Sequence, residues 1–342
     1  MKRRNRAYRL LRLTAVYLLL LPFLLLGWLY SRLPDRVYLE PGQALLLPRF
    51  GWVEPMGLHG SQNAASTQVV GSYQTTLSLG GWLPIKNIRT VVTERAQVTV
   101  CGTPFGVKMF SEGALIVGFS DIDSPGGSTV NPAKAAGLRL GDRVIRIGQI
   151  RTENNDAVKE ALEAARGSAA EVIYVRSGEI VPCEITGCSM GTVGSPGELK
   201  GKFLSAHAIG SIRINGENGV YGTTRTGFSG QTMPVAFAQE VETGDAQILA
   251  TVAGETPRTY HVRIEKISDA NPRRNMVIRV MDKALLTRTG GIVQGMSGSP
   301  ILQNGRLVGA VTHVLVNDPT RGYGIFAQIM LEQAEQVATA EK

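Results

Sequence analysis

The residues whose types and spacing indicate chemistry most strongly are Gly295-Met296-Ser297-Gly298. A serine on a tight turn between glycines leaves room for backbone N–H groups to converge beside its hydroxyl, as an oxyanion requires. We therefore predict that Ser297 is a nucleophile and that the N–H groups of Gly295 and Ser297 form an oxyanion hole. Ser299 is the competing serine, although Pro300 beside it suits the entrance of a strand. The alternative is a turn of small residues without chemistry.

The chain that follows this serine predicts a β-hairpin. Asn304-Gly305 is the dipeptide most typical of a type I′ turn, and the apolar strand 307–311 comes directly after it. No helical pattern follows Ser297, so the segment differs from the strand-to-helix nucleophile turn of α/β-hydrolases. The order of serine turn, strand, hairpin turn and strand resembles the nucleophile region of chymotrypsin-like and HtrA serine proteases.

A second patterned region lies in the middle of the chain. It contains a short helix ended by Gly137, a strand over 143–147, and a helix over 157–166 that Asn155-Asp156 can cap. This order resembles a PDZ domain of the HtrA type, and we place that domain at residues 98–187. Such a domain binds an extended peptide as an added strand and collects its terminal carboxylate on loop N–H groups. Phe105-Gly106-Val107 is the predicted peptide-binding loop, unless its glycine only permits a tight turn.

The N-terminal segment predicts a membrane anchor. Residues 13–30 form an uncharged run, about the length that a helix needs to cross a bilayer. Six basic residues precede this run, and the first acidic residue is Asp35. Basic flanks stay in the cytoplasm, so the rest of the chain is expected outside it. A cleaved signal peptide is the alternative, but residues 31–34 carry no small-x-small cleavage pattern.

The charge of the chain argues against a nucleic-acid partner. The formal net charge is +8, yet most of that excess comes from the six basic residues at the N-terminus. The body of the protein is nearly neutral and lacks the basic excess typical of DNA- or RNA-binding domains. No metal or other cofactor is expected, because the three cysteines and four histidines show no metal-ligand spacing.

The C-terminal sequence indicates a particular family of serine proteases. Residues 289–326, TGGIVQGMSGSPILQNGRLVGAVTHVLVNDPTRGYGIF, closely resemble the SpoIVB family of sporulation serine peptidases, as do residues 106–119, 194–201 and 214–222. The resemblance implies a chymotrypsin-like β-barrel peptidase exported into the space between the forespore and mother-cell membranes. It also implies cleavage of a regulatory membrane protein that leads to activation of a late sigma factor, and self-cleavage near the anchor.

The same resemblance assigns two members of a catalytic triad. Ser297 matches the nucleophile of the family, and Asp282 matches the acid that would orient the catalytic histidine. A solvated carboxylate at the end of a strand is the alternative for Asp282.

The histidine of the triad is the difficult residue. The Gly-His motif that precedes a Pro-Gly-Glu-Leu segment in the family is missing before Pro196. His207 keeps the chain order of histidine, aspartate and serine and is the predicted base. His313 matches a family histidine outside the triad and is the alternative base. His261 is interpreted as a half-exposed strand residue. Without a base the serine is a weak nucleophile.

Together these features predict a mainly β protein. The expected parts are a basic stub and anchor helix (1–30), a membrane-proximal β-rich segment (31–97), the PDZ domain (98–187) and a peptidase domain with a shortened first barrel (188–342). We expect a membrane-anchored serine endopeptidase that acts on a protein substrate. The alternative is a proteolytically impaired family member whose PDZ domain binds a peptide. A segment of its own chain is one candidate for that peptide.

Overall fold

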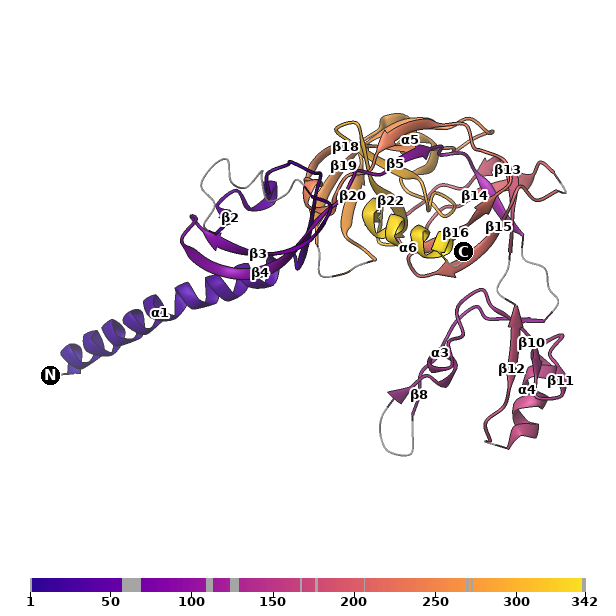
Figure 1. Cartoon of the computed structure of the whole chain (residues 1–342), viewed down its shortest axis with the longest axis horizontal. Coiled ribbons are helices and arrows are strands. Elements are labelled where there is room, and N and C mark those ends of the chain that lie inside the picture. Colours follow the sequence, from indigo (N-terminus) through magenta and orange to yellow (C-terminus); the bar gives the residue numbers. More distant parts are fainter. Residues whose placement is uncertain are drawn as a thin grey trace. The chain divides into compact units, whose positions relative to one another are not determined.

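The computed structural model describes residues 2–56, 69–108, 113–123, 129–166, 168–175, 178–205, 207–268, 271 and 273–339. Strands dominate these residues, as the mainly β expectation requires. Two compact units make up the chain (Figure 1). The N-terminal unit combines residues 1–96 with the distant segment Val235–Glu242, and the C-terminal unit contains residues 97–234 and 243–342.

The N-terminal unit consists of one long helix and a four-stranded sheet of order β1-β4-β3-β2. Its elements are α1 (Lys2–Arg32), β1 (Arg36–Leu39), the 3-10 helix η1 (Pro48–Phe50), β2 (Val53–Pro55), β3 (Gly71–Leu79) and β4 (Leu83–Val92). Leu29 and Leu33 pack with Val37, Leu77 and Ile88 in the core of this unit. Among the residues whose side chains the structure describes, no helix qualifies as long and apolar enough to cross a membrane.

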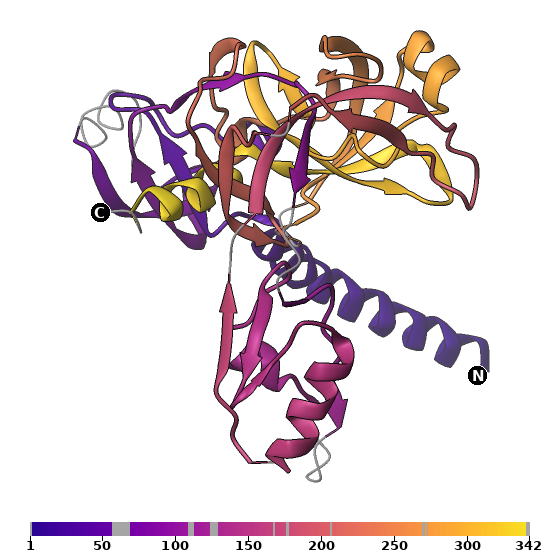
Figure 2. The same cartoon turned by 90° about the vertical axis from the view of Figure 1, so that its right-hand side faces the viewer.

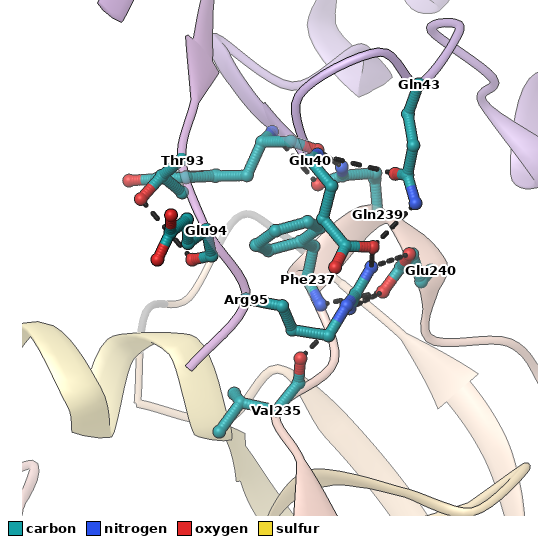
Figure 3. Close-up of polar contacts among 10 residues, drawn as sticks. Glu40, Gln43, Thr93, Glu94, Arg95, Val235, Phe237, Gln239 and Glu240 are labelled. Carbon is teal, nitrogen blue, oxygen red and sulfur yellow. Dashed lines mark hydrogen bonds and ion pairs between the residues drawn. The ribbon is translucent and has the colours of Figure 1, made fainter. Parts of the chain in front are cut away.

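A segment far along the chain completes this unit. Within Val235–Glu242, residues 238–240 form the 3-10 helix η2 (Ala238–Glu240), and the Phe237 ring stacks on Tyr38 with 5.9 Å between centroids. Figure 3 shows the contact that fixes the segment. The guanidinium of Arg95 donates to both carboxylate oxygens of Glu240 at 2.8 and 2.9 Å, and to Glu40 at 2.9 Å. The guanidinium also lies 4.3 Å from the centroid of the Phe237 ring.

The C-terminal unit begins with an open sheet. Its strands are β6 (Phe105–Lys108), β13 (Gly178–Cys188), β14 (Leu199–Phe203), β15 (Gly210–Gly216) and β16 (Gly219–Thr224). They follow the order β14-β13-β15-β16, with β6 paired to β13, while β5 (Gln97–Val100) pairs separately with β17 (Gln231–Pro234). Among the described residues, this part of the chain therefore forms an open sheet, in the position where a chymotrypsin-like protease has its first barrel.

A small α+β insert lies between β6 and β13. It contains β7 (Ala114–Leu115), β8 (Ile122–Asp123), β9 (Thr129–Val130), α3 (Pro132–Ala135), β10 (Arg143–Ile147), β11 (Ile150–Arg151), α4 (Asn155–Ala165) and β12 (Val172–Val175). Helix α4 packs against β10 and β11 (Figures 1 and 2). The predicted strand 143–147 is confirmed, and α4 covers most of the predicted helix, with Asn154 as its N-cap rather than Asn155.

The boundaries of the insert differ from the predicted PDZ domain of residues 98–187. β6 pairs with β13, with Val107 opposite Ile180 and Phe105 opposite Pro182. Phe105-Gly106-Val107 therefore form a strand of the open sheet, and the prediction that they form a peptide-binding loop is wrong. After the insert, β12 pairs with β10, whereas β13 pairs with β6, β14 and β15.

The rest of the C-terminal unit is a closed barrel followed by a helix. Its elements are β18 (Gly244–Ala250), β19 (Arg258–Ile267), β20 (Met276–Val280), α5 (Lys283–Thr289), β21 (Pro300–Gln303), β22 (Arg306–Leu315), β23 (Asp318–Phe326) and α6 (Ala327–Thr339). The barrel order is β18-β19-β20-β23-β22-β21, so the last three strands return in reverse order. The predicted turn between β21 and β22 is confirmed by positive φ angles at Asn304 (52°) and Gly305 (73°).

Candidate active site

Ser297 lies on the loop that connects α5 to β21, at one end of the barrel. Its side chain is exposed, and its hydroxyl donates a hydrogen bond of 2.7 Å to the carbonyl of Thr312 on β22. Gly295 and Gly298 flank it with φ angles of 95° and 87°, a backbone conformation that disfavours side chains. The glycines therefore create the tight turn that the sequence predicts.

The backbone N–H groups of this turn divide into two sets. Those of Met296, Gly298 and Ser299 donate to carbonyl groups of the protein, at 3.1, 2.8 and 3.1 Å. In the part of the chain that the structure describes, the N–H groups of Gly295 and Ser297 donate no hydrogen bond to the protein. These are the two groups that the sequence assigns to an oxyanion hole. Both are available to a negatively charged oxygen beside the Ser297 hydroxyl.

A segment between β13 and β14 supports the serine loop. Gln294 donates its N–H to the carbonyl of Gly197 at 2.7 Å and accepts from the N–H of Leu199 at 2.8 Å. Gly191 donates to the carbonyl of Thr289 at 2.8 Å. The backbones approach so closely that a Cβ atom on Gly290 would lie 2.5 Å from the Gly191 carbonyl oxygen. Sequence reasoning missed this support, although the glycines at these positions were a visible signal.

Asp282 is the N-cap of helix α5. Its Oδ1 accepts from the N–H of Leu285 at 2.9 Å, and its Oδ2 accepts from the backbone N–H of His261 at 3.4 Å. Among the described residues, no histidine ring donates to this carboxylate. The structure therefore gives Asp282 a capping role and leaves its assignment as the triad acid a prediction.

His207 lies in the exposed loop between β14 and β15. Its backbone N–H donates to the Ser205 hydroxyl at 2.9 Å. Within the described ranges its ring takes part in no hydrogen bond or ion pair, so the structure does not join it to Ser297 or Asp282. Its role as the base remains a prediction.

His313 lies on β22, the strand whose Thr312 carbonyl binds the serine hydroxyl. It follows Thr312, whose carbonyl binds the Ser297 hydroxyl, and stands opposite Tyr323 in the β22–β23 ladder. Burial lowers the pKa of its imidazole below the usual value, and the positive charge of Arg274 lowers this pKa further. The imidazole is therefore neutral at pH 7, which is the form that accepts a proton.

His261 has a different environment, on the wall of the barrel. Its side chain is 50% exposed, and its Nε2 lies 3.5 Å from Oδ1 of Asp245. The interpretation of His261 as a half-exposed strand residue is confirmed. Searched over the described residues alone, the chain holds no group of three histidine, cysteine, aspartate or glutamate side chains that could bind a metal ion.

Comparison with known proteins gives one match. The family model described as SpoIVB peptidase S55 matches residues 151–331, just over half of the chain. This range includes the whole barrel, the segment that supports the serine loop, and the turn around Ser297. No curated protein and no solved structure matches the chain.

Proposed function

The chain belongs to the SpoIVB peptidase S55 family of serine peptidases, and we propose that it is a membrane-anchored endopeptidase whose nucleophile is Ser297. The observation that carries this proposal is the pair of N–H groups, of Gly295 and Ser297, that have no partner in the described residues and flank the exposed hydroxyl. A barrel with its serine loop between the third and fourth strands supports the chymotrypsin-like assignment.

The proposed reaction follows from this geometry. The Ser297 hydroxyl attacks the carbonyl carbon of a peptide bond, and its proton passes to a base. The N–H groups of Gly295 and Ser297 then stabilise the oxyanion of the tetrahedral intermediate. Collapse of the intermediate expels the amine, which takes up a proton, and leaves an acyl group on Ser297. Water hydrolyses this ester and regenerates the serine.

We propose that the proton acceptor is either His207 or His313. His313 is favoured by its position beside Thr312 and by a lowered pKa that keeps it neutral at pH 7. His207 keeps the family order of histidine, aspartate and serine along the chain. Asp282 is the proposed acid for either base, through a rearrangement of its capping bonds.

The anchoring part of the proposal rests on α1. Ten large apolar or aromatic side chains between residues 17 and 30 are exposed, and they are Tyr17, Leu18, Leu19, Leu20, Leu21, Phe23, Leu24, Leu25, Trp28 and Tyr30. Such a surface is favourable in lipid and costly in water. With α1 in a bilayer, the basic N-terminus stays in the cytoplasm, and the sheet of the N-terminal unit and the C-terminal unit lie outside it. Later cleavage near the anchor would release them.

The proposed substrate and location are supported by the resemblance to the family. We propose that the peptidase acts between the forespore and mother-cell membranes on a membrane-bound regulatory protein, whose cleavage leads to activation of a late sigma factor. The α+β insert is proposed to bind a peptide as a PDZ-like domain. Its small sheet and its helix α4 form the kind of platform on which an added strand can dock.

A second function is favoured by one observation, since no histidine ring is bonded to Ser297 within the described residues. A family member without a working base would serve as a peptide-binding module outside the cytoplasm. The two functions differ in turnover, because a triad without its base loses orders of magnitude in rate.

The test is hydrolysis of an unfolded protein substrate by the full chain in lipid nanodiscs. We expect cleavage that Ser297→Ala abolishes and that Ser299→Ala, the matched control two residues away, preserves. Cleavage that survives Ser297→Ala would contradict the assignment of the nucleophile. No cleavage by correctly folded protein would favour the binding module.

A further inference from the structure

Two tryptophans are exposed at one end of the sheet in the N-terminal unit. Trp82, in the turn between β3 and β4, is 72% exposed, and Trp52, just before β2, is 57% exposed. Their chain segments are adjacent, because Gly80 donates its N–H to the carbonyl of Trp52 at 3.2 Å. Large apolar side chains gathered in this way indicate an interaction surface.

The turn carries no charge. Residues 79–85, Leu-Gly-Gly-Trp-Leu-Pro-Ile, contain neither an acidic nor a basic side chain. Charged residues are the usual protection of a hairpin end against unwanted contacts, and none is present here. A tryptophan ring combines an apolar body with one N–H donor, and this combination favours the boundary between lipid and water. The chemistry of the turn therefore fits a lipid headgroup region.

The turn lies on the side of the unit from which α1 projects. Lys86 of β4 donates to the carbonyl of Leu33 at 2.6 Å, and its ammonium lies 5.0 Å from the centroid of the Tyr30 ring. β4 runs parallel to β1, which leads away from the end of α1. Trp82 precedes Lys86 by four residues, which is about 13 Å along a strand. From Lys86, the chain therefore runs back beside α1 towards the β3–β4 turn. Figure 1 shows β3 and β4 alongside the end of α1.

We propose that the surface formed by the β3–β4 turn and Trp52 enters the headgroup region of the bilayer that α1 crosses. This second membrane contact rests on the proposed anchoring of α1. It would fix the tilt of the N-terminal unit on the membrane, because a helix and a separate turn give two points of attachment. A phospholipid surface is the chosen partner because the turn adjoins the anchor and is uncharged.

The experiment uses the full chain reconstituted in vesicles of phosphatidylcholine and phosphatidylglycerol. The chain has three tryptophans, at positions 28, 52 and 82, so pairs of Trp→Phe substitutions leave one reporter at a time. Lipids brominated near the headgroup end of the acyl chain quench a tryptophan at that depth. We expect strong loss and a blue shift of emission for Trp82 and Trp52, and quenching of Trp28, which reports insertion of α1. Far-ultraviolet circular dichroism checks the folding of each variant.

The possible outcomes separate this inference from the anchor. Quenching of Trp28 without quenching of Trp82 or Trp52 would overturn the second contact and leave the anchor in place. Absence of quenching at all three positions would overturn both. A blue-shifted but unquenched Trp82 would mean that protein, such as a second copy of the chain, covers the surface, and would also overturn the inference.

Discussion

At the scale of single residues, the hydroxyl of Ser297 is held by an acceptor that cannot take its proton. The carbonyl of Thr312 accepts the hydrogen bond, and a carbonyl is far too weakly basic to deprotonate serine. Attack on a peptide requires a histidine to replace that carbonyl as the acceptor. The N–H groups of Gly295 and Ser297, which donate no hydrogen bond among the described residues, are proposed to stabilise the oxyanion that forms next.

The pH dependence of acylation tests His313 as that histidine. Its pKa is held below the usual 6.5 by burial and by Arg274, and only the neutral ring accepts a proton. The acylation rate of Ser297 should therefore rise with pH and reach its plateau with a midpoint below 6.5. His313→Gln should remove this dependence, and His207→Gln is the matched control. A pH profile that depends on His207 and not on His313 would contradict the assignment.

Substitutions at Asp282 distinguish its capping role from a role in the triad. Asparagine caps a helix as well as aspartate does, so Asp282→Asn should leave the unfolding free energy close to that of the wild type. Asp282→Ala should lower it by about 1 kcal/mol. Because Asp282 is the proposed triad acid, we expect Asp282→Asn to lower the peptidase rate by about 10⁴-fold with stability unchanged. A variant that keeps most of the rate would show that the carboxylate only accepts backbone hydrogen bonds and caps α5.

At the scale of elements, Arg95 holds the segment Val235–Glu242 to the strands of the N-terminal unit. Its side chain is 6% exposed, and it pairs with both Glu240 and Glu40. The hydrogen bond from Arg95 holds the pKa of Glu40 below its usual 4.5. The stabilisation from Glu40 is therefore present at neutral pH and is lost as the pH falls below 4.5. Segment 235–242 leads directly into β18, the first strand of the barrel.

Removing Arg95 tests this contact. Arg95→Ala leaves two carboxylates close together without their cation, and breaking a buried ion pair in this way costs about 3 kcal/mol or more. We expect faster hydrogen exchange in β1, β4 and segment 235–242. The control is Arg89→Ala, on β4 just before Arg95, whose exposed side chain bonds only to Ser72 among the described residues. Equal exchange in the two variants would show that Arg95 does not hold the segment.

At the scale of the whole molecule, local patterns were predictable and long-range pairings were not. Asn304-Gly305, the strand 143–147 and the glycines around Ser297 act through neighbouring residues, so their structure could be read from the chain. Phe105-Gly106-Val107 could not, because their partner strand lies more than 70 residues away. The joining of Val235–Glu242 to the N-terminal unit spans a still longer separation, for which the sequence holds no local signal.

The prediction of the catalytic residues shows the same difference between local patterns and long-range contacts. Ser297 and the N–H groups of Gly295 and Ser297 belong to one turn, and among the described residues neither N–H group donates a hydrogen bond, so the oxyanion hole stays a prediction. A triad depends on three distant segments, and only their folded positions decide whether the side chains meet. The Asp282 side chain was ambiguous in the sequence between a triad acid and a strand-end carboxylate, and the structure adds a helix cap that neither reading contained.

The most direct test of the central claim is to locate the adduct of a fluorophosphonate on the full chain by peptide mass spectrometry. A reactive serine with a formed oxyanion hole is phosphonylated selectively, whereas ordinary surface serines are not. We predict a single modified residue, Ser297, and no adduct on Ser297→Ala. An adduct on Ser299, or an unmodified Ser297 in folded protein, would contradict it.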